Sequence, residues 1–241
     1  MKPKNVAVIT GGASGIGLAI VKELIENEVF PIVLDIIPMT NQFSNEFGTS
    51  VEYYQCDLFD EVQLISTLDK IILRHDQIDY IINNAAIQYI EPFEKILLSH
   101  WDQTMTVNLR SPLIIIKKLK SRLRENSHII NITSVHGEKP RTEKFAYDAS
   151  KAALNLMTKE LALDFAKNKI LVNAISCGAT NTPMNNHFSD KEVLKSSIAK
   201  IPLGRVASPE EIARFTCYIL LKTSYITGQV LTIDGGRSIN N

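Results

Sequence analysis

Residues 6–17 read VAVITGGASGIG, an apolar run that passes directly into a glycine-rich turn. The run Val6–Thr10 predicts a buried strand, and a helix is predicted to begin at Gly15. Glycine lets the backbone turn sharply, and the amides at a helix N-terminus bind phosphate. The stretch therefore indicates a pyrophosphate site, although an ordinary glycine-rich connection between a strand and a helix has the same pattern.

The rest of the chain repeats this alternation of strand and helix. Further strands are predicted over Val29–Asp35, Val51–Gln55, Ile78–Asn83, His128–Thr133, Ile170–Ser176 and Gln229–Ile233. Helices are predicted over Gly15–Glu28, Asp60–His75, Ser99–Arg124, Ala146–Lys167 and Ser208–Lys222. Most strand runs are continuously apolar, as in strands that are covered on both faces. We therefore expect an α/β fold in which one doubly wound domain, residues 1–241, has a seven-stranded, mostly parallel sheet flanked by helices.

The composition is that of a folded protein, with 45% hydrophobic and 22% charged residues. The formal net charge is zero, so general attraction to nucleic acid or to an anionic membrane is not expected. A basic run lies at residues 117–124, but it ends a predicted helix, where the helix dipole favours cations. We interpret this run as a solvated helix end.

No targeting, membrane or metal signal stands out. The first apolar run ends at Gly11, too early for a signal peptide, and no apolar stretch approaches the ~20 residues that span a bilayer. The three cysteines form no CxxC pair, and the histidines His75, His100, His128 and His187 lack the spacing of a zinc site. We expect a cytoplasmic protein with reduced thiols and no bound metal.

One stretch, residues 179–203, interrupts the alternation. It contains Pro183, Pro202 and a polar middle. It is interpreted either as a surface excursion with a short helix or as a lid over a substrate site. The lid is favoured, because ligands of open α/β sheets bind beyond the carboxyl ends of the strands.

The pattern Tyr-x-x-x-Lys occurs twice, as Tyr147 with Lys151 and as Tyr218 with Lys222. Residues four apart lie on one face of a helix, so each pair is compatible with joint action. Only Tyr147 has a serine thirteen residues before it, Ser134, directly after a predicted strand. We therefore interpret Tyr147 as the catalytic candidate and Tyr218 as structural.

Taken together, these features resemble the classical short-chain dehydrogenase/reductase family over nearly the whole chain. The resemblance rests on Thr10-Gly11-x-x-x-Gly15-x-Gly17, on Asp35 at the end of the second strand, on Asn83-Asn84-Ala85-Ala86, and on Ser134 with Tyr147 and Lys151. Two positions depart from the family pattern. Ala86 replaces the glycine of Asn-Asn-Ala-Gly, and Cys177 replaces the proline of a Pro-Gly turn.

The resemblance implies a Rossmann-like fold and hydride transfer between NAD(H) and a carbonyl or alcohol. Its catalytic set corresponds here to Asn108, Ser134, Tyr147 and Lys151, with Asn108 holding a water in the proton relay. Hydride transfer to a carbonyl leaves negative charge on oxygen, which needs a proton donor and a hydrogen bond. A tyrosine has a pKa of about 10, and the ammonium of Lys151 is expected to lower that of Tyr147.

The resemblance also implies which residues bind the cofactor and the substrate. The cofactor residues would be Gly11, Ser14, Gly15, Ile16, Gly17, Asp35, Asp57, Leu58, Asn84, Ala85, Tyr147, Lys151, Thr180 and Thr182. Asp35 would accept hydrogen bonds from the adenosine ribose and repel a 2′-phosphate, so NAD(H) is expected rather than NADP(H). His136 and Met184 are candidates for the substrate pocket, although His136 is equally compatible with a loop position without a role.

The helix predicted over Ala146–Lys167 has more apolar residues than one sheet-facing stripe needs. Since the resembled family usually forms homotetramers, we expect a symmetric oligomer of four subunits. Pro202-Leu203-Gly204-Arg205 resembles 3-oxoacyl-carrier-protein reductases, but other dehydrogenases share it. The related sugar-nucleotide epimerases and dehydratases share Tyr-x-x-x-Lys but have a larger C-terminal substrate domain. Here only the short stretch over residues 179–203 and one helix-strand unit follow residue 178, which argues against that alternative. A dinucleotide-binding sensor with little turnover is the alternative from another class.

Overall fold

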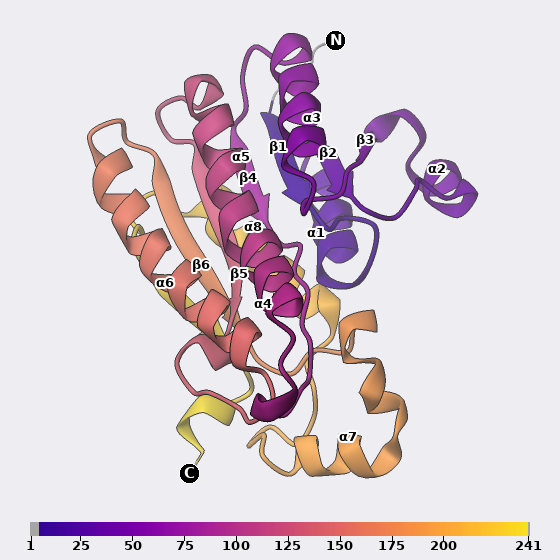
Figure 1. Cartoon of the computed structure of the whole chain (residues 1–241). Helices are drawn as coiled ribbons and strands as arrows, with labels where there is room; N and C mark the ends of the chain where they lie inside the picture. Colours follow the sequence, from indigo (N-terminus) through magenta and orange to yellow (C-terminus); the bar gives the residue numbers. More distant parts are fainter. Residues whose placement is uncertain (1–4, 241) are drawn as a thin grey trace.

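The computed structural model describes residues 5–240, without the side chains of residues 186–188, and in this range seven strands form one sheet. The strand order is β3-β2-β1-β4-β5-β6-β7, and every pair of neighbours is parallel (Figure 1). The strands are β1 (Asn5–Thr10), β2 (Val29–Asp35), β3 (Glu52–Gln55), β4 (Tyr80–Asn83), β5 (His128–Ser134), β6 (Leu171–Cys177) and β7 (Val230–Ile233). The predicted Rossmann-like, doubly wound sheet is confirmed.

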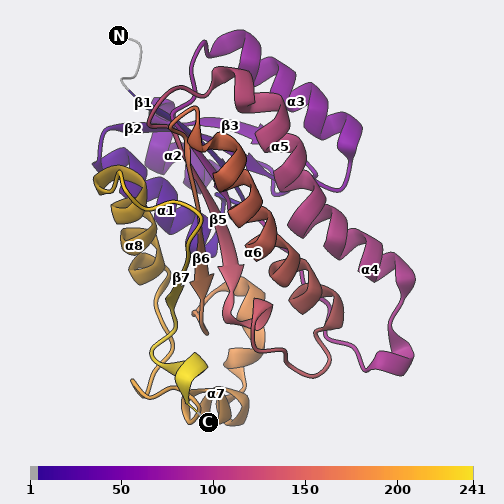
Figure 2. The same cartoon turned by 90° about the vertical axis from the view of Figure 1, so that its left-hand side faces the viewer.

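Helices cover both faces of the sheet, as Figure 2 shows. One face packs against α1 (Gly15–Glu26), α2 (Asn41–Phe47) and α8 (Pro209–Lys222). The other face packs against α3 (Glu61–Arg74), α5 (Ser111–Leu119) and α6 (Phe145–Ala166). Each interface is a separate apolar cluster, so the continuously apolar strands are buried on both sides.

Local signals explain where several helices begin. α8 begins with the capping box that the sequence indicates: the Ser208 side chain accepts from the Glu211 amide, and the Glu211 carboxylate accepts from the Ser208 amide. The sequence pattern does not predict α2, a short helix capped by Thr40, whose Phe43 and Phe47 side chains pack onto the core. Tertiary burial of these two rings compensates for its short length.

The regular helix predicted over Ser99–Arg124 is wrong in detail. The chain is helical there, but as α4 (Leu98–Met105), a π-helical turn (Thr106–Arg110), α5 and a 3-10 turn (Lys120–Arg122). Pro112 lies in the first turn of α5 and has no amide proton to donate to the preceding turn. The wide turn contains Asn108, and such turns occur often at functional sites.

The stretch over residues 179–203 forms a 3-10 segment (Pro183–Ser189) and α7 (Lys191–Ile198). Both lie beyond the carboxyl ends of the strands (Figure 1). β1 and β4 are neighbours in the centre of the sheet, where the strand order reverses and open α/β sheets bind ligands. None of the helices within residues 5–240 has the length and apolar character needed to cross a membrane.

Candidate active site

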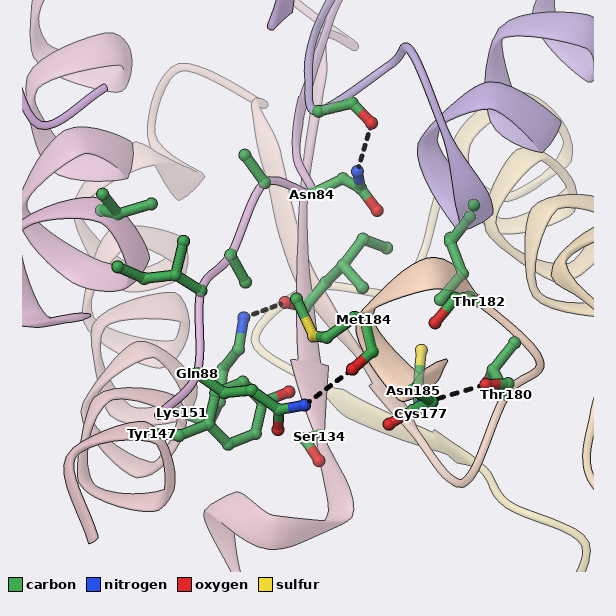
Figure 3. A pocket seen from close by; sticks show the side chains of 18 of the residues that line it. Asn84, Gln88, Ser134, Tyr147, Lys151, Cys177, Thr180, Thr182, Met184 and Asn185 are labelled. Carbon is green, nitrogen blue, oxygen red and sulfur yellow. Dashed lines mark hydrogen bonds between the residues drawn. The ribbon is translucent and has the colours of Figure 1, made fainter. Parts of the chain in front are cut away.

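A cavity of about 340 Å³ opens at the carboxyl ends of the strands, between the sheet and the stretch over residues 179–203 (Figure 3). It brings together sixteen of the eighteen side chains or glycines proposed from the sequence. These are Gly11, Ser14, Gly15, Ile16, Asp35, Asp57, Leu58, Asn84, Ala85, Ser134, His136, Tyr147, Lys151, Thr180, Thr182 and Met184. The two that do not line it are Gly17 and Asn108.

The glycine-rich turn forms the wall beside β1. Gly11 has φ +69°, and a Cβ on it would lie 2.9 Å from Asn84 Nδ2 and from Ala85 Cα. Ser14 precedes α1 without a side-chain cap, so its hydroxyl leaves the first amides of the helix to other acceptors. Gly17 lies behind this wall, where a Cβ would meet the Gly11 carbonyl oxygen at 1.9 Å. The turn fits a phosphate group, with Gly17 supporting it from behind.

Asp35 ends β2 at the same cavity and is only 6% exposed. Its Oδ2 accepts from the Ala13 amide (2.9 Å), and its Oδ1 accepts from the Ile37 amide (3.0 Å). These bonds hold the carboxylate against the glycine-rich turn. The position fits an acceptor for the hydroxyls of an adenosine ribose.

Ser134, Tyr147 and Lys151 form the opposite part of the wall (Figure 3). Ser134 ends β5, and Tyr147 and Lys151 lie one turn apart on α6. Lys151 Nζ donates to the Ile132 carbonyl oxygen (2.9 Å) and lies 5.7 Å from the centroid of the Tyr147 ring. All three side chains are buried.

The ionisation of this group differs from the sequence-based expectation. Burial raises the pKa of Tyr147 above its ordinary value, and a hydrogen bond with Ser134 acts in the opposite direction. The expected lowering by Lys151 is therefore wrong for this structure. Burial also lowers the pKa of Lys151 to about 8, because its ammonium is removed from water. Tyr147 is accordingly a neutral phenol near pH 7, the form that donates a proton.

Asn108 is 1% exposed and is not at the cavity surface. Its Oδ1 accepts from the Ile87 amide (2.8 Å), while its Nδ2 donates to the Ile87 carbonyl oxygen (2.9 Å) and to Ser150 Oγ (3.0 Å). The π-helical turn thus connects the loop after β4 to α6. The side chain positions two walls of the cavity.

The second Tyr-x-x-x-Lys pair lies away from the cavity. Tyr218 is on α8 and is 59% exposed, and neither it nor Lys222 lines the cavity. Among the described residues, no three His, Cys, Asp or Glu side chains are placed to hold a metal ion. The side chain of His187 lies outside the described residues.

Several cavity residues were not predicted from the sequence: Gln88, Arg141, Lys144 and Arg237. Lys144 is 5% exposed, donates to Gln88 Oε1 (2.7 Å) and lies 5.7 Å from the centroid of the Tyr147 ring. The sequence contained one signal for it, since a residue three positions before Tyr147 shares its helix face. Cys177 also lines the cavity, and burial raises the pKa of its thiol to about 12.

Known reductases match this chain over nearly its whole length. A family model described as enoyl-(acyl carrier protein) reductase matches residues 11–238. The acetoacetyl-CoA reductase of Acinetobacter sp. is 30% identical, over 98% of both chains. The 3-oxoacyl-[acyl-carrier-protein] reductase FabG of Thermotoga maritima is 31% identical, also over 98% of both chains. The chain belongs to the short-chain dehydrogenase/reductase family.

Solved structures of this family share the whole fold. A 4-hydroxyisoleucine dehydrogenase complexed with NADH superposes with a TM-score of 0.91 at 30% identity, covering 99% of this chain and 100% of that one. The Pseudomonas aeruginosa RhlG/NADP complex superposes with a TM-score of 0.88 at 28% identity, with coverage of 99% and 100%. This short-chain dehydrogenase/reductase is therefore an oxidoreductase, of a family whose solved members bind NADH in some cases and NADP in others.

Proposed function

We propose that the protein transfers a hydride between NAD(H) and the carbonyl or alcohol carbon of a small molecule. The observation that carries the proposal is the burial of Ser134, Tyr147 and Lys151 on one wall of a cavity whose other wall contains the glycine-rich turn and Asp35. One end has the features of a dinucleotide site, and the other has a proton donor.

The bound nicotinamide would supply or accept the hydride. In the reducing direction, Tyr147 donates its phenolic proton to the carbonyl oxygen, and Ser134 donates a hydrogen bond to the same oxygen. Lys151, held by the Ile132 carbonyl oxygen, provides positive charge beside the phenolate that forms. Asn108, the fourth residue of the set proposed from the sequence, supports the other three from behind the cavity by fixing the Ile87 loop against α6.

The proposed cofactor is NAD(H) rather than NADP(H). Asp35 is the carboxylate that would face the 2′ position of the adenosine ribose, and its neighbours Ala13 and Ile36 provide no positive charge. A 2′-phosphate placed there would be repelled by the carboxylate. The remaining proposed contacts are the glycine-rich turn for pyrophosphate and the segment with Thr180 and Thr182 for the nicotinamide half.

The proposal extends to assembly and compartment. On α6, Leu156 and Leu163 are 59% and 79% exposed, and apolar side chains of this size favour burial between subunits. A symmetric homotetramer is proposed to cover them. The three cysteines are all buried free thiols, as expected of a protein of the reducing cytoplasm.

The test is an NADH absorbance assay of the purified protein against oxo acids, simple ketones, oxo sugars and 3-oxoacyl thioesters, repeated with NADPH. Turnover of at least one class with NADH is expected. A 3-oxoacyl thioester as the preferred substrate would instead support a function like that of the carrier-protein reductases. Tight NADH binding without turnover of any class would overturn the proposal in favour of a dinucleotide-binding sensor.

A further inference from the structure

The substrate end of the cavity is cationic. Lys144, Arg141 and Arg237 line it, whereas the cavity-lining carboxylates among the described residues are Asp35, which ends β2, and Asp57, which lies just after β3, both at the proposed cofactor end. None of the three cations has a salt bridge with a residue in the described part of the chain. A protein of zero formal net charge thus places three cations without a salt-bridge partner at one end of its cavity, where Asp234 opposes the charge of Arg237 and Asp148 that of Lys144.

Lys144 is the buried member of this group. Its ammonium has one hydrogen-bond partner, Gln88 Oε1 (2.7 Å), which leaves two of its three protons for other acceptors. Lys144 also occupies the N-cap position of α6, where the helix dipole disfavours a cation. Burying an unpaired charge in such a place costs free energy, and a bound anion would offset that cost.

The groups around Lys144 compensate this charge only in part. Burial is the main cause that lowers the pKa of Lys144 to about 8, and Arg141 and Arg237 lower it further. Asp148 opposes this, but its Oδ2 accepts from the Arg141 amide (2.7 Å), and burial raises its own pKa. His136 also lines the cavity, and burial lowers its pKa to about 4, so it is neutral near pH 7.

We propose that Lys144, with Arg141 and Arg237, forms an anion subsite that selects substrates with a carboxylate close to the reacting carbon, namely short oxo acids and the corresponding hydroxy acids. Lys144 lies 5.7 Å from the centroid of the Tyr147 ring, so one small molecule can reach both. Gln88 positions Lys144 and also donates to the Met184 carbonyl oxygen (3.1 Å), which connects the subsite to the stretch over residues 179–203 (Figure 3). This inference rests on the proposed function and specifies its substrate class.

The first experiment compares acids with their neutral analogues. With NADH, kcat/KM is measured for 2-oxobutanoate, 3-oxobutanoate and 4-oxopentanoate, each against its methyl ester. At least one acid is expected to exceed its ester by tenfold or more, because a hydrogen bond to a charged group is roughly that strong. The subsite would be overturned if kcat/KM for each ester equalled or exceeded that for its acid. It would also be overturned if a neutral 3-oxobutanoyl thioester were the preferred substrate. Either result would leave the proposed function intact.

Substitution of Lys144 tests whether this side chain causes the preference for the acid over the ester. Lys144→Met keeps the length of the side chain but removes its charge, and it should lower the acid-to-ester ratio at least tenfold. Lys159→Met, at an exposed position of the same helix, is the matched control and should leave the ratio within twofold. An unchanged ratio in Lys144→Met would overturn the assignment.

The wild-type protein provides two further readouts. The value of kcat/KM reflects the ionisation of the enzyme before the ketone binds. The ratio of kcat/KM for the acid to kcat/KM for the ester should therefore fall as pH rises through about 8, where Lys144 loses its proton. Calorimetry of the NADH complex should show butanoate binding at least tenfold more tightly than butanamide, a result that does not require turnover. Equal binding of the acid and the amide would overturn the subsite even if no ketone is reduced.

Discussion

Tyr147→Phe isolates the proposed proton donor, because it keeps the ring and removes one oxygen. The ring is buried in the cavity wall, and its hydroxyl is hydrogen bonded with Ser134. Without the phenol, the alkoxide formed by hydride transfer would take its proton from water. A positioned general acid typically contributes about 10²- to 10⁴-fold, which is about 3 to 5 kcal/mol of transition-state stabilisation.

The same substitution should affect folding much less. It removes one hydrogen bond, worth about 1 kcal/mol, which corresponds to a change in Tm of roughly 2–4 °C for a chain of this size. Cofactor affinity should be largely retained, since the glycine-rich turn and Asp35 are unchanged. The expected signature is therefore a large fall in kcat with small changes in Tm and in the Kd for NADH.

The assay follows NADH oxidation with a substrate that the wild type reduces, and measures NADH binding by fluorescence in parallel. Tyr218→Phe is the matched control, because Tyr218 has the same local motif but is exposed on α8 outside the cavity. Its kcat should stay within a few-fold of the wild type. Normal turnover by Tyr147→Phe would refute the assignment of the active site.

Three further predictions concern the cofactor and the assembly. Gly17→Ala places a Cβ 1.9 Å from the Gly11 carbonyl oxygen, so the turn must shift, with a loss of about 1–3 kcal/mol in thermal unfolding and weaker NADH binding. With Asp35 present, kcat/KM should favour NADH over NADPH by up to about a thousandfold, from ~4 kcal/mol of repulsion at 4 Å, and equal values would show that Asp35 does not contact the ribose. Light scattering should give a homotetramer at micromolar concentration, and Leu156→Lys with Leu163→Lys should dissociate it; a wild-type monomer would contradict the proposed assembly.

Much of the fold follows from local pattern. The continuous apolar runs, the regular alternation with helices and the capping box at Ser208 predict the parallel sheet and most element boundaries to within a few residues. The pattern fails for α2 and for the π-helical turn around Asn108. In both places tertiary packing determines the local backbone, through the burial of two phenylalanine rings in one case and the contact with the Ile87 loop in the other.

The candidate site also has features that motif spacing predicts and features that only burial determines. Motif spacing identifies Ser134, Tyr147 and Lys151, because two of them share a helix face and the third ends a strand that parallel pairing places beside that helix. Spacing does not report burial, however. Motif reasoning therefore predicted the wrong direction for the pKa of Tyr147, where loss of solvation outweighs the other influences.

The sequence by itself predicted most of the order of strands and helices, the glycine-rich turn after β1, and which of the two tyrosine motifs lies at the cavity. Only the tertiary structure showed that Gln88 meets Lys144 across 56 residues of sequence, and that Arg141 and Arg237 line the same cavity. The physical reason is that periodicity and turn chemistry act between near neighbours along the chain. The charge and solvation of a cavity, in contrast, depend on side chains that meet only after parallel strands have aligned their carboxyl ends.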